Sequence, residues 1–224
     1  TDGYVMKFGA TGTRAWTRQF GGAGEDKVAS LAIGDDGSLI VASNEGGEAV
    51  VRKYATSDAT SAAVWVKSLG PLGAGGTIGG VAVDGGKIYL AGGTANAALN
   101  GGAGIATAHS GGQDGFVAAF TDAGSSATTD FVTYLGSGSA DRINGLAVED
   151  GRIFVAGDTR GTLPGATATR AGVSNAFAAE IGADGSLSWA RQFGVTTGEG
   201  YGRDIAVDMQ GASALDALGL PTGK

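Results

Sequence analysis

The sequence contains no cysteine, a single histidine and few charged residues, and these shortages exclude several classes of function. Without cysteine the chain has no disulfides, no thiol nucleophile and no thiolate metal ligand. Charged residues make up only 17% of the chain, and the net charge is −7. Nucleic-acid binding needs clustered basic residues that displace counterions from phosphate, and the 15 lysines and arginines here are scattered. We therefore expect no nucleic-acid partner.

Long hydrophobic runs are also missing. No apolar run approaches the roughly 18 residues that a membrane-spanning helix needs, so we expect no membrane span. No signal peptide opens the chain, which begins inside a pair of strand-like runs. This start predicts a segment of a longer polypeptide with flanking domains, in which any targeting signal would lie upstream.

Glycine, in contrast, is abundant, with 44 of the 224 residues. The usual share in globular proteins is about 7%. Glycine adopts positive φ at little steric cost, which suits a chain with many tight turns. Apolar residues at helical spacing are almost absent before residue 211. Together these features favour an all-β fold.

Four short apolar runs recur along the chain in a fixed order. Within residues 114–157 they are GFVAAF, DFVTYL, INGLAV and RIFVAG, each bounded by Gly, Asp, Ser or Asn, as is typical of strands. The spacing between copies is uneven, which favours the radial blades of a propeller over a strict solenoid. We predict a β-propeller of antiparallel four-stranded blades with about four blade equivalents, and a Greek-key sandwich is the alternative.

The order of the runs resembles the repeat of the SBBP-type bacterial β-propeller family. The resemblance is carried by IAVD, a short turn, a hydrophobic strand ending in VAG, then DGFVAAF and a W-x-x-x-x-G strand. It covers about residues 2–208. It implies a propeller in a large bacterial surface or secreted protein, usually without assigned chemistry.

The repeats predict the following boundaries within a propeller domain at 1–210: a strand pair at 2–20, blades at about 27–70, 77–136 and 142–194, and a closing strand at 202–208. If that last strand lies beside the opening pair, the two ends of the repeat region share one blade and close the ring. Its partner would have to come from Ala212–Leu218, whose residues favour a helix over a strand. Residues 211–224 are then a tail or the start of a following domain. They resemble the junction with a flagellin-like domain in some alphaproteobacterial flagellin-regulatory proteins.

Two long loops identify the face where a partner would bind. The connections Gly93–Gln113 and Asp158–Ser174 lie on the same face of the predicted propeller as the crossings between blades. Connections longer than about twelve residues inside a compact domain tend to be functional or mobile. Six polar residues fall at this face and are our candidate ligand-binding set: Asp141, Arg142, Asp158, Arg160, Tyr201 and Arg203. Asp and Arg at such crossings also cap turns and pair with one another, and this alternative stays open.

Other features have simpler interpretations than the chemistry they suggest. Residues 21–29, GGAGEDKVA, match a calcium-binding nonapeptide, but such sites need tandem copies and the next nine residues do not repeat the pattern. We interpret the match as an ordinary crossing between blades and expect no metal site. His109 lies near Ser110 and Asp114 without a recognisable nucleophile elbow, so we interpret it as a solvated loop residue.

One repeat position is aromatic in all four copies. It is occupied by Trp16, Trp65, Phe131 and Trp189. Recurrence at a fixed strand position favours packing between blades over a carbohydrate platform.

These observations predict a non-enzymatic repeat scaffold or protein-interaction module of a bacterial surface, secreted or flagellum-associated protein. We expect a protein or surface glycan as partner, an extracellular or cell-surface location, no catalytic residue and no cofactor. The alternative is a polysaccharide-acting propeller hydrolase or lyase, whose acidic residues would lie within about 5–10 Å of each other. Asp141, Asp158 and Glu199 are the candidates for it. A structural spacer without a ligand is a third interpretation.

Overall fold

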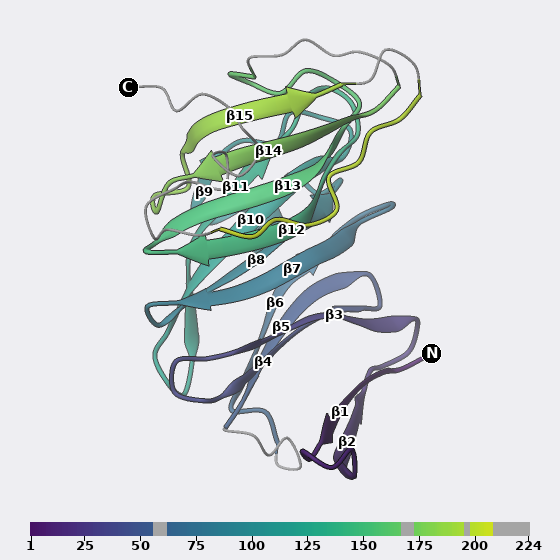
Figure 1. Ribbon diagram of the computed structural model, residues 1–224, viewed down its shortest axis with the longest axis vertical. Helices are drawn as coiled ribbons and strands as arrows, with labels where there is room; N and C mark the ends of the chain where they lie inside the picture. Colours follow the sequence, from purple (N-terminus) through teal and green to yellow (C-terminus); the bar gives the residue numbers. More distant parts are fainter. Residues whose placement is uncertain (56–61, 167–172, 195–197, 208–224) are drawn as a thin grey trace.

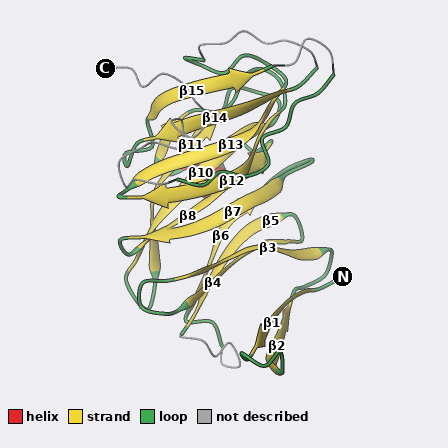
Figure 2. Ribbon diagram, in the orientation of Figure 1, coloured by secondary structure: helices red, strands yellow, loops and turns green. Residues whose placement is uncertain are grey.

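The computed structural model describes residues 1–55, 62–166, 173–194 and 198–207, which form antiparallel β-sheets with almost no helix (Figures 1 and 2). The all-β prediction is confirmed. The strands are β1 (Gly3–Phe8), β2 (Arg14–Phe20), β3 (Asp26–Ile33), β4 (Leu39–Glu45), β5 (Glu48–Tyr54), β6 (Trp65–Pro71), β7 (Thr77–Asp84), β8 (Lys87–Thr94), β9 (Ile105–Thr107), β10 (Asp114–Asp122), β11 (Ala127–Leu135), β12 (Asp141–Glu149), β13 (Arg152–Thr159), β14 (Asn175–Ile181) and β15 (Leu187–Phe193). Within the described ranges, no helix is both long and apolar enough to cross a bilayer.

The strands form four sheets that follow one another along the chain. They are the hairpin β1–β2, the sheet β3–β4–β5–β6, the central sheet β7–β8–β10–β11–β9 and the sheet β12–β13–β14–β15. The short strand β9, which pairs in parallel with β11, is an addition that the repeat did not predict. It lies in the long loop after β8, together with the 3-10 turn η1 (Leu99–Gly102). Figure 1 shows the sheets in succession along the long axis, with β1–β2 at one end.

Each contact between neighbouring sheets is filled by one hydrophobic cluster. Trp65 belongs to the cluster between the β3–β6 sheet and the central sheet, and Phe131 to the cluster between the central sheet and β12–β15. Trp16 packs at the edge of the cluster between the hairpin and the β3–β6 sheet. Trp65 and Phe131 are 8% and 6% exposed. Packing between sheets, predicted for this repeat position, is therefore confirmed for Trp65 and Phe131, whereas Trp16 and Trp189 are only half-buried.

The second strand of each complete repeat is buried on both faces. In β8, seven of the eight residues are buried, whereas β3 alternates between half-buried and exposed positions after Asp26. A strand covered by a sheet on either side reads as a continuous apolar run, and a strand covered on one side alternates. This explains why the RIFVAG and KIYLAG runs contain so few polar residues.

The glycine that ends these two runs is required by the first strand of the same sheet. A Cβ built on Gly92 would lie 2.1 Å from the carbonyl oxygen of Thr77, and one on Gly157 would lie 1.8 Å from that of Arg142. Real Cβ atoms do not approach backbone oxygens so closely. The VAG motif therefore reflects a close approach of two backbones.

The predicted closing strand is not formed. Residues 202–207 have no strand pairing and lie against β12 and β13, where the Gly202 amide donates to the carbonyl oxygen of Gly157 at 3.0 Å. In each complete sheet the first strand, β3, β7 or β12, pairs only with the second strand of that sheet. The second strand proposed for residues 202–207 was Ala212–Leu218, which lies outside the described residues. Figure 1 places residues 202–207 near β12 and the β1–β2 hairpin at the far end of the molecule. The described sheets thus form an open series, and the predicted closure through the two ends is absent from it.

Candidate functional site

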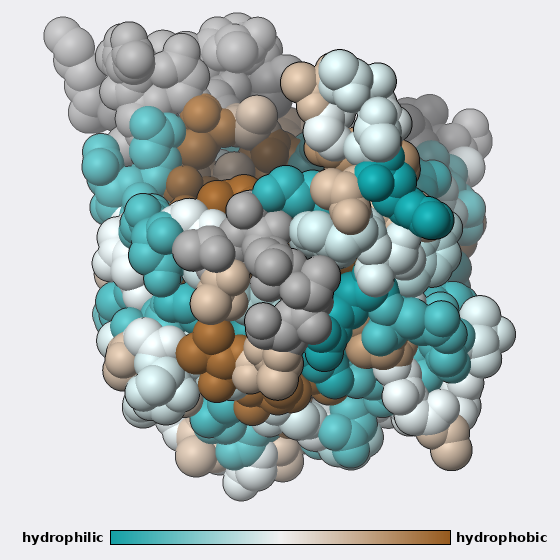
Figure 3. Space-filling model, turned by 90° about the horizontal axis from the view of Figure 1, so that it is seen from below, coloured by the Kyte–Doolittle hydropathy of each residue, from teal (hydrophilic) through white to brown (hydrophobic). Residues whose placement is uncertain are grey.

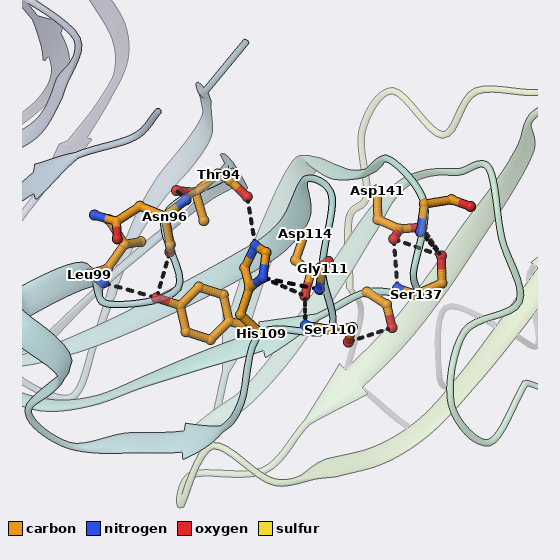
Figure 4. A network of polar contacts seen from close by, with 12 residues as sticks. Thr94, Asn96, Leu99, His109, Ser110, Gly111, Asp114, Ser137 and Asp141 are labelled. Atoms are coloured by element: carbon orange, nitrogen blue, oxygen red, sulfur yellow. Dashed lines mark hydrogen bonds and ion pairs between the residues drawn. The ribbon is translucent and has the colours of Figure 1, made fainter. Parts of the chain in front are cut away.

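Buried aspartates organise the loops at the end of the molecule where β3 and β12 begin. Asp141 is fully buried, and its Oδ2 accepts hydrogen bonds from the Ser137 amide at 2.6 Å and the Ser137 hydroxyl at 2.9 Å (Figure 4). Burial raises the pKa of Asp141, although bonds from Thr159 and Ser137 oppose that shift. This carboxylate closes its own loop rather than facing solvent, in line with the turn-capping alternative.

Asp26 has the same role in the crossing that matches the calcium nonapeptide. Its two carboxylate oxygens accept bonds from the amides of Gly22 at 2.9 Å and Gly46 at 3.0 Å. Both oxygens are therefore used by the protein backbone. Among the described residues no group of three or more His, Asp or Glu side chains could hold a metal ion.

His109 is enclosed rather than solvated, which corrects the sequence interpretation. Its side chain is 8% exposed, and its ring meets that of Tyr134 edge to face with centroids 5.3 Å apart. Nδ1 accepts a hydrogen bond from the Gly111 amide at 3.1 Å, which leaves Nε2 to donate to the carbonyl oxygen of Thr94 at 3.3 Å (Figure 4). Loop histidines are usually solvated, but here η1 and β9 fold the long loop back over β11, so the ring is covered.

Asp114 lies beside this histidine at the start of β10. Its Oδ2 accepts a bond from the Ser110 amide at 2.5 Å and lies 3.9 Å from Nδ1 of His109, while its buried Oδ1 has no hydrogen-bond partner. Burial raises the pKa of the Asp114 carboxyl, and the Ser110 bond opposes the rise. With the hydroxyl of Ser110 donating to Gly136, this group holds the long loop in place and leaves no activated nucleophile.

The predicted binding residues separate into two groups. Asp141 and Arg142 lie between the central sheet and β12–β15, where Nε of Arg142 donates to Oε1 of Gln113 at 2.9 Å. Nε2 of Gln113 in turn donates to the carbonyl oxygen of Gly75 at 2.6 Å. This chain of bonds connects loops of neighbouring sheets.

The second group gathers around Tyr201, whose ring is stacked under the Arg203 guanidinium at 5.4 Å from the ring centroid. The Tyr201 hydroxyl donates to Oε2 of Glu199, and this bond raises the pKa of the phenol, with further electrostatic effects of Asp158 and Arg160. Tyr201 is 43% exposed, and both arginines are exposed. The structure therefore brings four residues of the predicted set together with Glu199, which the sequence named only for the enzymatic alternative.

Asp158 anchors this second group to the sheet. It is 8% exposed, and its Oδ1 accepts a bond from Nδ2 of Asn144 at 2.8 Å. The same Asn144 amide donates to the carbonyl oxygen of Gly202 at 2.8 Å. One amide thus fixes residues 202–207 to β12, which orients Arg203 and Tyr201 at the surface. We call Asp158, Arg160, Glu199, Tyr201 and Arg203 the loop-end cluster.

A polar network at the opposite end was missed by the sequence analysis. Lys53 is 4% exposed, and its ammonium donates to Oδ2 of Asp36 at 2.7 Å and to Asp122 of the central sheet. Nε1 of Trp65 also donates to Asp122, at 3.2 Å. Burial alone would lower the pKa of Lys53, but the bonds to Asp122 and Asp36 outweigh it and raise the pKa. The signal in the sequence was a lysine inside the apolar run AVVRKY.

This network lines a cavity of about 210 Å³ between the β3–β6 sheet and the central sheet. Asp35 crosses the same gap, because its Oδ2 accepts a bond from the Gly86 amide at 2.8 Å. Asp84 repeats the contact one sheet further on, with the Gly151 amide at 2.8 Å. The network therefore joins sheets, and its charged groups already satisfy one another.

Comparison with known proteins shows that the chain is similar in sequence to a curated protein. It is 32% identical, over 255 aligned positions, to a protein of Caulobacter vibrioides named "Regulatory protein FlaEY". The alignment covers 99% of this chain and 26% of the relative, so the chain spans about a quarter of that curated protein's length. No protein-family model matches the chain.

Proposed function

We propose that this chain is a non-enzymatic scaffold that binds a protein partner through the loop-end cluster, within a larger regulatory protein connected with the bacterial flagellum. The observation that carries the proposal is that exposed Arg160, Tyr201 and Arg203 lie at one end of the stack of sheets, where Asp158 and residues 202–207 are joined through Asn144. Similarity along almost the whole chain to a protein named as regulatory supports the regulatory part. The connection with the flagellum rests on the flagellin-related resemblance of residues 211–224.

The composition of the cluster suits a protein surface. Tyrosine and arginine are enriched among the residues that dominate binding energy at protein interfaces. Here an exposed tyrosine ring lies under an arginine, which limits the conformational freedom that both side chains would lose on binding. Asp158 and Asn144 hold this arrangement from the sheet side. A partner with a carboxylate and an apolar side chain close together would match it.

The finer architecture is also part of the proposal. We propose that the sheets are blades of a propeller of the SBBP type, in a surface or secreted protein. Two features support this: the four strand runs keep one order in every complete repeat, and the first strands β3, β7 and β12 lie next to one another. A surface location predicts that protease added to intact cells cleaves the chain, and full protection would argue against it.

The test is charge reversal at the cluster in the full-length protein. The double variant Arg160→Glu/Arg203→Glu should weaken binding to flagellin subunits at least tenfold by calorimetry and should reduce swimming motility. Arg14→Glu, an exposed charge reversal in the distant hairpin, is the matched control and should behave as wild type. Circular dichroism should show that both variants keep the β-fold. Unchanged binding and motility in the double variant would make the proposal wrong.

A further inference from the structure

The only histidine of the chain makes a set of contacts that fits one protonation state. His109 lies in the long loop between β8 and β10, and its side chain is 8% exposed. Nδ1 accepts a hydrogen bond from the Gly111 amide at 3.1 Å, and Nε2 donates to the carbonyl oxygen of Thr94 at 3.3 Å (Figure 4). A neutral imidazole has one acceptor and one donor and satisfies both contacts, whereas an imidazolium has two donors. Protonation of Nδ1 therefore removes the acceptor of the Gly111 amide.

An acceptor for the new donor already lies beside the ring. Oδ2 of Asp114 is 3.9 Å from Nδ1, and the buried Oδ1 of the same carboxylate has no hydrogen-bond partner. Each carboxylate oxygen has two lone pairs, so Oδ2 can accept from the ring and from the Ser110 amide together. A hydrogen bond between charged groups is roughly twice as strong as one between neutral groups. Once the ring is charged, exchange of the Gly111 bond for a bond to Asp114 is therefore favourable.

The groups packed around the ring come from neighbouring strands. Asp114 at the start of β10 is the carboxylate that faces the ring, and Asp141 at the start of β12 acts electrostatically on Asp114. Tyr134 of β11 meets the ring edge to face with centroids 5.3 Å apart. Burial raises the pKa of Tyr134, so its hydroxyl stays neutral near pH 7. Strand β8 presents the carbonyl oxygen of Thr94. Asp114 is thus the group toward which a charged ring turns.

Glycines supply the backbone freedom that this exchange needs. Gly111 and Gly112 have φ angles of 111° and 72°, which other residues rarely adopt. A Cβ on Gly112 would lie 2.7 Å from the carbonyl oxygen of Ser139, so the loop is held close to the crossing that leads into β12. The Ser110 hydroxyl contacts the same crossing, because it donates to the carbonyl oxygen of Gly136 at 3.2 Å. A shift of residues 109–112 therefore changes how the loop meets the next sheet.

We propose that His109 is a pH-sensitive switch of this long loop and operates between about pH 5 and 8, the range in which histidine changes its charge. Above this range the neutral ring holds the Gly111 amide. Below it the imidazolium bonds to Asp114, the Gly111 bond is lost and residues 109–112 move away from residues 136–139. Asp114 and Tyr134 keep their positions, since both are buried in the central sheet. The switch needs no partner, so its test is independent of the loop-end cluster.

Nuclear magnetic resonance of the 224-residue chain from about pH 8 to about pH 5 tests the switch, and the one histidine gives one imidazole to follow. The ring nitrogens report protonation. The protection factor of the Gly111 amide, which corrects for the intrinsic pH dependence of exchange, reports the hydrogen bond. This protection should fall by about tenfold or more, with the same midpoint as protonation of the ring. The Leu99 amide, which donates to the Tyr134 hydroxyl at 3.0 Å in the same loop, should keep its protection.

Phe8 provides a remote reference, because its side chain is 56% exposed in the separate hairpin β1–β2. Figure 3, which views the molecule from the hairpin end, shows hydrophobic residues at the surface among polar ones. The resonances of the Phe8 ring should stay constant over the same pH range. A change at Phe8 that follows the change at Gly111 would show that the whole fold responds to pH and would overturn the proposal.

Two variants separate the switch from a general effect of acid. In His109→Gln the side chain does not titrate, so the protection of Gly111 should be independent of pH. In Asp114→Asn the ring still titrates but the charged acceptor is gone, so the loss at Gly111 should move to lower pH. Asn175 occupies the position of Asp114 in β14, which makes this replacement compatible with the strand. The proposal would be overturned by a Gly111 protection that is constant in wild type, that falls together with that of Leu99, or that still falls in His109→Gln. An unchanged midpoint in Asp114→Asn would equally overturn it.

Discussion

The central sheet and the N-terminal hairpin are built from the same repeat, yet equivalent side chains lie in opposite environments. Phe120 of β10 is fully buried, and Phe8 of β1, the same residue at the same repeat position, is 56% exposed. The central sheet has a sheet on each face, and the hairpin has a described neighbour on one face only. Burial in this protein is therefore decided by the neighbouring sheet and not by the strand that carries the residue.

Hydrogen exchange should show the largest difference between the two regions. Local opening free energies range from about zero at frayed elements to the global stability, on the order of 5–15 kcal/mol. We expect amides of β8 and β10 to be the most protected and those of residues 2–20 and 202–207 to exchange fastest, measured at low protein concentration to limit association. Uniform protection across the sheets would show that the hairpin is as cooperative as the centre.

Matched truncations should give the next largest effect. Phe120→Ala empties a closed core site and should cost about 3–5 kcal/mol of unfolding free energy. Phe8→Ala removes a side chain that is already half in solvent, so the cost should stay below about 1 kcal/mol. Urea unfolding of both variants measures the comparison. Equal losses would mean that the β1 face is covered in solution.

Substitution of two lysines that share one repeat position should give a smaller difference in unfolding free energy. Lys53→Met removes the buried ammonium that joins Asp36 to Asp122 and should destabilise by about 1–3 kcal/mol, because charged hydrogen bonds are lost. Lys7→Met, at the same position of the hairpin, should cost less than about 1 kcal/mol. Below about pH 4 the difference in destabilisation between the two variants should narrow. The hydrogen bond from Lys53 holds the pKa of Asp36 below its ordinary value. The stability that this bond contributes is present above the ordinary pKa and is lost as the pH falls from there toward the pKa in the folded state. A gap that persists unchanged at pH 3 would contradict this account.

The smallest effect at neutral pH should come from Asp114→Asn. Burial raises the pKa of Asp114, so the folded state binds this proton more tightly than the unfolded state, and wild-type stability falls as pH rises above about 4. The amide does not titrate, and Asn175 stands at the same position in β14. The stability of the variant relative to wild type should therefore increase with pH, by no more than about 1.4 kcal/mol per pH unit for one proton. A relative stability that is independent of pH would show that folding leaves the pKa of Asp114 unchanged.

The local sequence pattern was sufficient to predict the strands. It was insufficient to predict the environment of side chains in the loops. The runs of Val, Ile, Phe and Tyr between Gly and Asp turns predicted the four recurring strands of each of the three complete repeats, but not β9. His109 was assigned to solvent because no local pattern indicated that η1 and β9 would fold over it. Of the six residues predicted as one binding set, four lie together in the structure. The roles of Asp141 and Asp26 as loop caps depend on backbone amides that a sequence does not place.

The sequence by itself determined the β-fold, the order of the four recurring strands within each sheet and the packing of Trp65 and Phe131 between sheets. All three follow from alternation, turn residues and a position that recurs in every copy. Only the tertiary structure decided whether the series of sheets closes. Closure depends on the rotation between successive sheets and on a partner for residues 202–207. Identical local patterns are compatible with a ring, an arc or contacts between chains.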